Sequence, residues 1–405
     1  MRILSVTAQK PNSTGSGVVL SELVKGFAKE GARQAVLGGV YQEDQIVLPK
    51  GTDFYPVYFE TEQLPFPIVG MSDEMPYRSL KYSQLNETRY EQFGTVFTAV
   101  LRKTVESFKP DIILSHHLYL LTALVREAYP DSCVIGISHG SDLRQIKKNS
   151  LKREFIKRQI RSLDGVFALH EKHKEDIALT YGYDKTRIKV TGAGYNNDIF
   201  YTERKKVKKH PIRLVFAGKV SEKKGVISLI RSLDSLKYRS DELQLRVAGG
   251  AGDQEEFATI QRMAASCRFS VVFLGKITQE ELAEEFRTGD LMVLPSFYEG
   301  LPLVVIEALA CGIKVVVTDL PGIKDWLAQQ MEISNVAFVE PPGMYNTDEP
   351  LTAELGDFEK RLSRTLEEAL RQSETQPVKL DGLTWNGVSQ RAYKYIEEIY
   401  KQSEI

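Results

Sequence analysis

The chain is poor in cysteine. Only Cys133, Cys267 and Cys311 occur among its 405 residues, and their spacing follows no paired pattern. Three such cysteines argue against both a disulfide framework and a zinc site, and they suit a reducing compartment. Net charge is scarce as well, at −1, because 53 basic residues balance 54 acidic ones. This balance gives no support to wholesale nucleic-acid binding, so we expect no nucleic-acid partner.

Long apolar runs are also missing. No stretch approaches the length of a membrane span, and the N-terminal MRILSVTAQ has the pattern of a short strand without the apolar stretch of a signal peptide. We therefore expect a cytoplasmic protein. Its 42% hydrophobic and 26% charged residues are typical of a globular protein, and the length predicts two domains.

Three ligand-binding signatures are absent. The segment KPNSTGSGVV, which follows the first predicted strand, has Gly15 and Gly17 but carries Leu20 where a dinucleotide fingerprint has its third glycine. We interpret it as a flexible loop entering a helix. No G-x-x-x-x-G-K-[ST] loop and no D-x-D pair occurs anywhere. NAD and ATPase functions are therefore not favoured, and we expect neither a cofactor nor a metal ion.

Short apolar runs alternate with amphipathic segments almost throughout the chain. In the first half, strands are expected at 2–8, 34–40, 111–117, 132–140, 165–170 and 188–194, and helices at 17–32 and 120–129. The charged segment 202–211 has the composition of a linker. The alternation then restarts, with strands expected at 212–218, 244–250, 271–277, 291–296, 313–319 and 336–340.

This βαβ alternation predicts an α/β protein of two Rossmann-like doubly wound domains. We expect an N-terminal domain at 1–203, a second domain at 204–384 and a terminal helix at 385–405. Ligands of doubly wound sheets bind outside the carboxyl ends of the strands. Two such domains are expected to face each other across a cleft, with the chemistry in the loops that follow the strands.

The segment PSFYEGLPLVVIEALACG (295–312) holds two glutamates, Glu299 and Glu307, eight positions apart. A helix is expected to begin near Pro302 and to end before Gly312. The loop ahead of it, with Gly300, Leu301, Pro302 and Leu303, would present free backbone N–H groups and suit an anion. Glu307 has apolar neighbours, so we favour a ligand-binding role, such as accepting hydrogen bonds from a diol, over a solvated or capping role.

A second constellation is FAGKVSEKKGV (216–226). Gly218 allows a tight turn after a strand, and Lys219, Lys223 and Lys224 follow. Lysines placed after a strand can hold a diphosphate and offset the charge on a departing phosphate oxygen. The alternative is an ordinary solvated basic loop.

Histidines follow three predicted strands. His139 lies in ISHGSDL (137–143), where it could project into the cleft, with Asp142 helping to fix the loop. His116 and His117 are expected to include one residue of the site wall. His170 and His173 better suit an ordinary surface helix. For each of them a structural role is the alternative.

The segment RQIKKNSLKREFIKRQIR (144–161) has eight basic residues and one acidic residue, with apolar residues at helical spacing. It could meet anionic lipid at the inner membrane face or a phosphorylated acceptor. We slightly favour the alternative, a helix packed on the core with a solvated basic side.

Taken together, these motifs resemble retaining glycosyltransferases of the GT-B fold, specifically family 4 (glycosyl transferases group 1). The E-x7-E pair at 299–307 resembles that family's motif, FAGKVSEKKG its phosphate-binding loop, and HGSDL its HG-x-D loop. Further similar segments are VAGGAGDQEEF (247–257), VVFLGKITQEEL (271–282), TGAGYNNDIF (191–200) and LTWNGVSQRAYKYIEEIY (383–400). The last resembles the family's closing helix, which implies that the helix at 385–405 crosses back to the N-terminal domain. The resemblance extends over nearly the whole chain.

The resemblance implies roles for individual residues. Glu307 would bind the ribose of a nucleotide sugar, Glu299 the donor sugar, and Lys219 and Lys224 the diphosphate. Residues implied to bind the donor are Gly15, Gly17, Gly218, Lys276, Ile277, Gly300, Leu301, Pro302, Leu303 and Glu307; the catalytic set is His139, Lys219, Lys224 and Glu299. The family usually has Arg at position 219, and lysine lacks its bidentate fork.

The function implied is metal-independent transfer of a sugar, with retention, from a nucleotide diphosphate sugar to a glycan, lipid or small-molecule acceptor. Two alternatives stay open. One is an epimerase or phosphorylase of the same fold, and the other is a non-catalytic nucleotide-sugar-binding protein.

Overall fold

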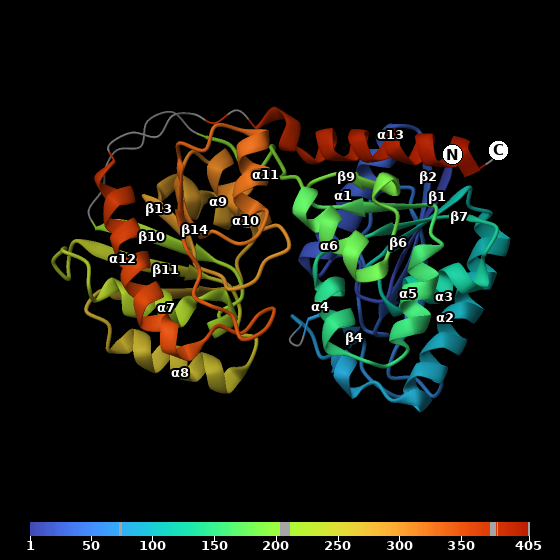
Figure 1. The fold of residues 1–405 in the computed structure, drawn as a ribbon, viewed down its shortest axis with the longest axis horizontal. Helices are drawn as coiled ribbons and strands as arrows, with labels where there is room; N and C mark the ends of the chain where they lie inside the picture. Colours follow the sequence, from blue (N-terminus) through green and yellow to red (C-terminus); the bar gives the residue numbers. More distant parts are fainter. Residues whose placement is uncertain (73–74, 203–210, 373–377, 379, 404–405) are drawn as a thin grey trace. The chain divides into compact units, whose positions relative to one another are not determined.

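The structure is a computed structural model that describes residues 1–72, 75–202, 211–372, 378 and 380–403. The chain divides into two compact units (Figure 1). Unit 1 comprises Met1–Gly194 together with Trp385–Ile405, and unit 2 comprises Tyr195–Thr384. Most of the predicted linker, residues 203–210, lies outside the described residues.

The first boundary falls nine residues before the predicted one, at 194/195 instead of 203/204. Packing explains the difference. Tyr195 and Phe200 are buried in the hydrophobic core of unit 2, and the guanidinium of Arg287 donates to the carbonyl of Ile199 at 3.1 Å. The residues after Gly194 therefore belong to the second core.

Unit 1 is built on a seven-stranded parallel sheet in the order β3-β2-β1-β6-β7-β8-β9. Its strands are β1 (Arg2–Thr7), β2 (Arg33–Val40), β3 (Asp53–Tyr58), β6 (Ile112–His116), β7 (Cys133–Ile137), β8 (Gly165–Ala168) and β9 (Ile188–Val190), and a separate pair is formed by β4 (Val69–Gly70) and β5 (Leu80–Lys81). Its helices are α1 (Gly15–Lys29), α2 (Glu87–Phe108), α3 (Leu120–Ala128), α4 (Ser141–Lys148), α5 (Arg153–Arg161), α6 (Glu171–Tyr181) and α13 (Trp385–Ser403). The central strands are buried along almost their whole length, as their continuous apolar runs predict.

Helix α13 belongs to unit 1, along which it runs in red in Figure 1. It packs closely on α1, because a Cβ atom built on Gly26 would lie 2.1 Å from Oγ of Ser389. The rings of Phe27 and Tyr393 are 5.8 Å apart at the same contact. The glycine in α1 therefore allows the C-terminal helix to dock on the N-terminal sheet domain.

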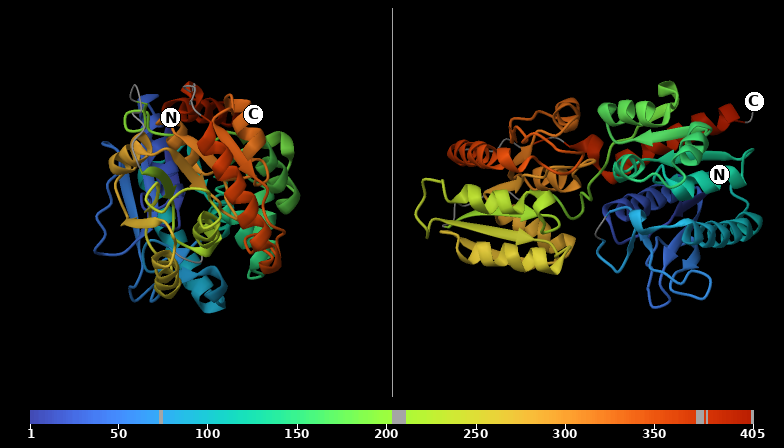
Figure 2. Two further views of the ribbon diagram at one scale, coloured as in Figure 1. Left: turned by 90° about the vertical axis from the view of Figure 1, so that its left-hand side faces the viewer. Right: turned by 60° about the horizontal axis from the view of Figure 1, so that its bottom comes forward.

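Unit 2 has a six-stranded parallel sheet in the order β12-β11-β10-β13-β14-β15. Its strands are β10 (Ile212–Ala217), β11 (Leu243–Ala248), β12 (Ser270–Gly275), β13 (Leu291–Leu294), β14 (Lys314–Thr318) and β15 (Val336–Val339), and its helices are α7 (Val226–Leu233), α8 (Gln254–Ala265), α9 (Gln279–Thr288), α10 (Leu303–Ala310), α11 (Ile323–Gln330) and α12 (Leu355–Arg371). Figure 2, on the right, shows α8 in yellow along one side of this sheet.

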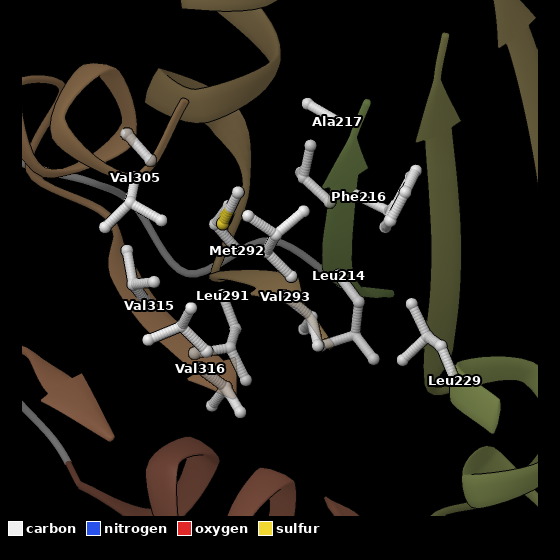
Figure 3. Close-up of a cluster of buried hydrophobic side chains, with 14 of the residues drawn as sticks. Leu214, Phe216, Ala217, Leu229, Leu291, Met292, Val293, Val305, Val315 and Val316 are labelled. Atoms are coloured by element: carbon white, nitrogen blue, oxygen red, sulfur yellow. The ribbon is translucent and has the colours of Figure 1, made fainter. Parts of the chain in front are cut away.

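The core of unit 2 forms where the central strands meet the helices (Figure 3). Leu214 and Phe216 from β10 and Met292 from β13 are fully buried, and Leu229 of α7 packs with them. Burial of each such side chain contributes about 1.5–3 kcal/mol to folding. This core holds the carboxyl ends of β10 and β13 rigidly side by side.

The basic segment 144–161 forms two helices, α4 and α5, instead of one continuous helix. Asn149 ends α4 in an extended conformation, and its amide donates to the carbonyl and side-chain oxygens of Gln145 at 3.2 and 2.6 Å. Ile156 and Ile160 are buried in the core of unit 1, and Arg144 is buried too. The apolar residues of α5 thus face the protein core, as the favoured alternative predicts.

Candidate functional site

The chain reverses its direction of travel across the sheet of unit 2 between β10 and β13. From β10 it proceeds outward to β11 and β12, and then it returns to place β13 on the other side of β10. The loops after these two strands diverge at such a switch point and leave room for a ligand. They are the loops that carry Gly218 to Lys224 and Pro295 to Leu303, the two segments that the sequence singles out.

Glycines let the strand ends approach one another. Gly218 follows β10 and has φ of +153°, and Gly249 follows β11 with φ of +148°. A Cβ atom on Gly249 would lie 1.7 Å from the carbonyl oxygen of Gly218, so only glycine fits there. The backbone N–H of Gly218 donates to Ala248 at 2.9 Å. These contacts fix the turn that leads into the lysines.

Gly225 ends the same loop and lets it pass close to Pro295, and its replacement by alanine should destabilise unit 2. Its φ is +71°, and a Cβ atom there would lie 2.0 Å from the backbone oxygen of Pro295. We expect Gly225→Ala to lower the free energy of unfolding by about 2–4 kcal/mol. Gly275→Ala is the matched control, because Gly275 also has positive φ, +69°, but open space around it. Urea unfolding followed by hydrogen exchange of unit 2 peptides measures both, and equal losses would contradict the close approach to Pro295.

Lys224 and Glu299 are brought together by these loops. Nζ of Lys224 donates to Oε1 of Glu299 at 2.6 Å, and Oγ of Ser296 donates to the same oxygen at 2.6 Å. The side chains are 29% and 12% exposed, so the pair is accessible but partly shielded from water. Ser296 has no local signature in the sequence, and its role is visible only because β13 ends beside the β10 loop.

The remaining predicted residues of unit 2 lie on the same edge of the sheet. Lys219 follows Gly218 and is partly buried. Lys276, after β12, is exposed, and its side chain lies over Gly250, where a Cβ atom would be 2.7 Å from its Cε. Ile277 packs partly on the core, which leaves its backbone as the group available to a ligand. Nζ of Lys223 donates to the buried Asp348 at 2.9 Å and so anchors the loop.

Helix α10 begins directly after this loop, as predicted, with Pro302 in the capping position and Leu303 as its first residue. Gly312 follows the helix with φ of +76°. The N–H groups of Leu303 and Val304, in the first turn of α10, have no partners within the helix and can donate to an anion. Pro302 has no N–H group and contributes by starting the helix.

Glu307 is an unusual carboxylate. It is only 9% exposed in the middle of α10. Among the residues that the structure describes, no side chain pairs with it, and burial raises its pKa to about 7. A carboxylate in this state gains most from a ligand that brings hydroxyl donors. The solvated and capping roles do not fit this environment.

Unit 1 has its own switch point between β1 and β6. His116 ends β6, and His117 follows it with φ of +69°. Nδ1 of His116 lies 3.1 Å from Nε2 of His139, and the rings of His117 and His139 are 4.5 Å apart. The structure thus places His139 against both His116 and His117 at the end of β6, where the sequence predicted one wall residue. Burial lowers the pKa of His116 and His139 well below 6.5, with a further contribution from neighbouring histidines.

A buried chain of hydrogen bonds fixes the loop that carries His139. Oγ of Ser138 donates to Asp142 at 2.9 Å and lies 2.9 Å from Nε2 of His173. Nδ1 of His173 accepts from the N–H of Leu169 at 3.2 Å, so the proton of its neutral ring is on Nε2. Asp142, fully buried, also accepts from the N–H of Leu118 at 2.8 Å. Asp142 therefore fixes the loop, as the sequence predicted.

The expected surface position of His170 and His173 is wrong, because both are buried, 5% and 4% exposed. His170 caps α6, with Nδ1 accepting from the N–H of His173 at 3.1 Å. The sequence of α6 has no strong apolar stripe, so the burial of these residues depends on Ser138 and on the end of β8. Only the tertiary structure reveals it.

The buried histidines should make unit 1 sensitive to acid. Burial lowers the pKa of His173 to about 4 and that of His117 to about 3, from 6.5 when unfolded. The unfolded chain binds more protons below pH 6.5, so stability is complete above that pH and falls toward pH 4. Each neutral histidine contributes about 1.4 kcal/mol per pH unit in that range. His173→Gln, which keeps a donor for Ser138, should flatten the pH dependence of unfolding between pH 6.5 and 4, and an unchanged slope would contradict a buried neutral ring.

Gly15 and Gly17 lie in the first turn of α1 instead of in a flexible loop. Oγ1 of Thr14 accepts from the N–H of Gly17 at 3.2 Å and caps the helix. Gly15 is surrounded by open space, whereas a Cβ atom on Gly17 would lie 3.0 Å from the backbone N of Asn12. Gly15 thus leaves the helix end open to a ligand, and Gly17 allows the preceding chain to pass close by.

Lys10 is a candidate that the sequence analysis missed. It follows β1, pairs with Asp44, and lies 4.6 and 4.9 Å from the ring centres of Tyr41 and Tyr77. No local motif marks it, because its partners come from distant segments.

In the described part of the chain, no group of three or more His, Cys, Asp or Glu side chains is arranged to hold a metal ion. None of the helices described there has both the length and the apolar composition that crossing a bilayer requires.

Two family models match adjacent parts of the chain. The model described as Glycosyltransferase Family 4 covers residues 13–198, and that of glycosyl transferases group 1 covers residues 199–342. A D-inositol 3-phosphate glycosyltransferase of Pseudarthrobacter chlorophenolicus is 32% identical over 159 residues, 36% of this chain and 38% of that protein. An N-acetyl-alpha-D-glucosaminyl L-malate synthase of Bacillus anthracis is 23% identical over 336 residues, 78% of each chain.

Solved structures show the same fold. Sucrose-phosphate synthase from Thermosynechococcus elongatus matches with a TM-score of 0.70 at 15% identity, over 99% of this chain and 100% of that one. Anabaena HepE in complex with UDP and glucose matches with a TM-score of 0.65 at 14% identity, over 98% and 100%. With its two parallel-sheet units and both adjacent family matches, the chain belongs to the group 1 glycosyltransferases of the GT-B fold.

Proposed function

We propose that the protein is a retaining glycosyltransferase that moves a sugar from a nucleotide diphosphate sugar to an acceptor hydroxyl without a metal ion. The observation that carries the proposal is Glu307, a buried carboxylate without a partner among the described residues, in the helix that follows the switch point of unit 2. A ribose diol supplies two hydroxyl donors of the kind that such a group requires. The solved relative HepE, of the same fold, was crystallised with UDP and glucose.

The other residues of this edge take roles that suit their chemistry. Lys219, Lys224 and the backbone N–H groups of Leu301 and Leu303 hold the diphosphate, with Gly218 shaping the turn and Pro302 starting the helix. Lys276 and the backbone of Ile277 contact the base. Glu299 contacts hydroxyls of the donor sugar, and its bond to Lys224 places the two charges side by side. In unit 1, His139 contacts the substrate, and Gly15 and Gly17 open the end of α1 toward it.

The reaction breaks the bond between the anomeric carbon and the diphosphate oxygen, and the electron pair leaves with the diphosphate. The ammonium groups and the end of α10 offset the charge that builds up there. The acceptor oxygen attacks the same face of the oxocarbenium-like centre. Its proton passes to the departing phosphate oxygen, so no separate base is required. Metal independence is proposed because Lys219 and Lys224 can supply the positive charge for the diphosphate and the sequence has no D-x-D motif.

The test measures release of nucleoside diphosphate from UDP-, GDP- and ADP-sugars, each with a panel of sugar, sugar-phosphate and hydroxy-acid acceptors, with EDTA present. We expect release that depends on one donor and one acceptor, with the anomeric configuration retained in the product. An epimerised donor without acceptor, or turnover that requires inorganic phosphate, would instead identify an epimerase or a phosphorylase. Donor binding without turnover of any kind would identify a non-catalytic nucleotide-sugar-binding protein.

A further inference from the structure

His116 and His139 form a hydrogen-bonded pair whose proton can lie in only two places. Nδ1 of His116 is 3.1 Å from Nε2 of His139, and the rings are nearly parallel, at 13°. Burial keeps both rings neutral at pH 7. One of the two facing nitrogens therefore carries the hydrogen and the other accepts it.

The buried side of His116 distinguishes the two arrangements. Its Nε2 is buried, and no atom of the described residues pairs with it. If His139 donated, Nε2 of His116 would carry an N–H buried without an acceptor. If His116 donates, the buried Nε2 carries only a lone pair. Buried N–H groups without a partner are rarer in proteins than buried acceptors without one, so the second arrangement is favoured.

The tautomer of His116 then sets that of His139. When Nε2 of His139 accepts, the proton of the neutral ring must lie on Nδ1. His139 is partly exposed, and within the described residues its Nδ1 has no partner. It follows β7, whose last residue, Ile137, pairs with His116 beside the switch point between β1 and β6. This edge of the sheet is where a ligand is expected.

We infer that His116 is a positioning residue that holds His139 as the Nδ1–H tautomer, so that His139 donates a hydrogen bond to a substrate oxygen and does not act as a general base. The inference rests on the proposed function, which it deepens by assigning the chemical role of this side chain. Ser138, Asp142 and His173 hold the loop from the other side. The acceptor proton is thereby left to the departing phosphate.

The tautomer itself is tested on the complete wild-type chain by nitrogen-15 NMR of histidine-labelled protein at pH 7.5. The His139 signals are assigned by comparison with His139→Gln. We expect the proton on Nδ1 of His139 and on Nδ1 of His116. A His139 ring protonated on Nε2 would overturn the inference, and this readout requires no transfer activity, so it is independent of whether the proposed function holds.

Two substitutions of His116 test the positioning role. Asn can place its amide N–H where Nδ1–H lies, whereas Leu has similar bulk and no donor. We expect His116→Leu to shift His139 toward the Nε2–H tautomer and to lower kcat by about tenfold with a smaller change in KM, and His116→Asn to recover most of the loss. His170→Asn, which keeps a capping residue on α6, is the control. Leu and Asn variants with the same kcat and an unchanged His139 spectrum would overturn the inference, and thermal unfolding of each variant shows whether it is folded.

Discussion

Replacing Lys224 by methionine is expected to lower kcat for glycosyl transfer by about two to three orders of magnitude. Methionine retains most of the length of the side chain but removes the ammonium group that the proposed mechanism places at the departing diphosphate. The side chain is 29% exposed and its partner Glu299 keeps Ser296 as a donor, so the fold should survive. Measurement of initial rates with the identified donor and acceptor tests the effect.

The matched control for this change is Lys360→Met. Lys360 is 75% exposed and, among the described residues, pairs only with Asp357 on the same helix, so its loss should leave the rate within about twofold, as for most surface changes. Lys224→Arg should recover part of the rate, because it restores the charge with a different shape. If Lys224→Met transferred sugar as fast as the control, the ammonium group would have no part in stabilising the leaving group.

Donor affinity is expected to weaken by about tenfold between pH 8 and pH 6, because Glu307 must be ionised to accept two hydroxyl donors. Its pKa is about 7 in the free protein as a result of burial. Binding favours the ionised form and lowers that pKa, so a proton is released on binding near pH 7. As the pH falls below 7, more of the free protein must lose a proton first, and the apparent Kd rises.

Calorimetric titration with a nucleotide sugar in buffers of different ionisation enthalpy measures both the affinity and the released proton. A nucleotide sugar is preferred to a free nucleoside diphosphate because its diphosphate does not itself titrate near pH 7. The Glu307→Gln variant should bind the nucleotide sugar more weakly at pH 8, and its binding should release no proton from this position. An equal pH dependence in wild type and variant would contradict the assignment of Glu307 to the donor. The same carboxyl favours the folded state fully below pH 4.5, and this contribution is lost as the pH rises through about 7.

The sequence could predict the repeating fold because the buried strands are continuous apolar runs. The runs that contain Ile112–His116 and Leu291–Leu294 need no tertiary information to be identified as strands. It could also predict the loops of the candidate site, since Gly218 and Pro302 are turn and helix-start residues. The residue types and their positions suggested that Lys224 holds a diphosphate and that Glu307 accepts from a diol, and the family resemblance then related both roles to a nucleotide sugar.

Other features depend on distant parts of the chain. The pair between Lys224 and Glu299 joins residues 75 positions apart, and the contact between His116 and His139 joins residues 23 apart. The long helices α2 and α12 were not predicted, although Leu355, Phe358 and Leu362 of α12 recur at helical spacing and would have allowed it. The single helix expected at 144–161 is interrupted at Asn149, whose side-chain amide donates a hydrogen bond to the side chain of Gln145. No local pattern shows which of these contacts will form.

The central claim is that unit 2 binds the nucleotide diphosphate at the switch point between β10 and β13. A crystal structure of the protein soaked with the nucleotide diphosphate that best protects it from thermal unfolding tests it most directly. We predict ribose hydroxyls within hydrogen-bond distance of Glu307 and phosphate oxygens against Lys224 and the first turn of α10. A nucleotide bound elsewhere, with Glu307 still unpaired, would contradict it.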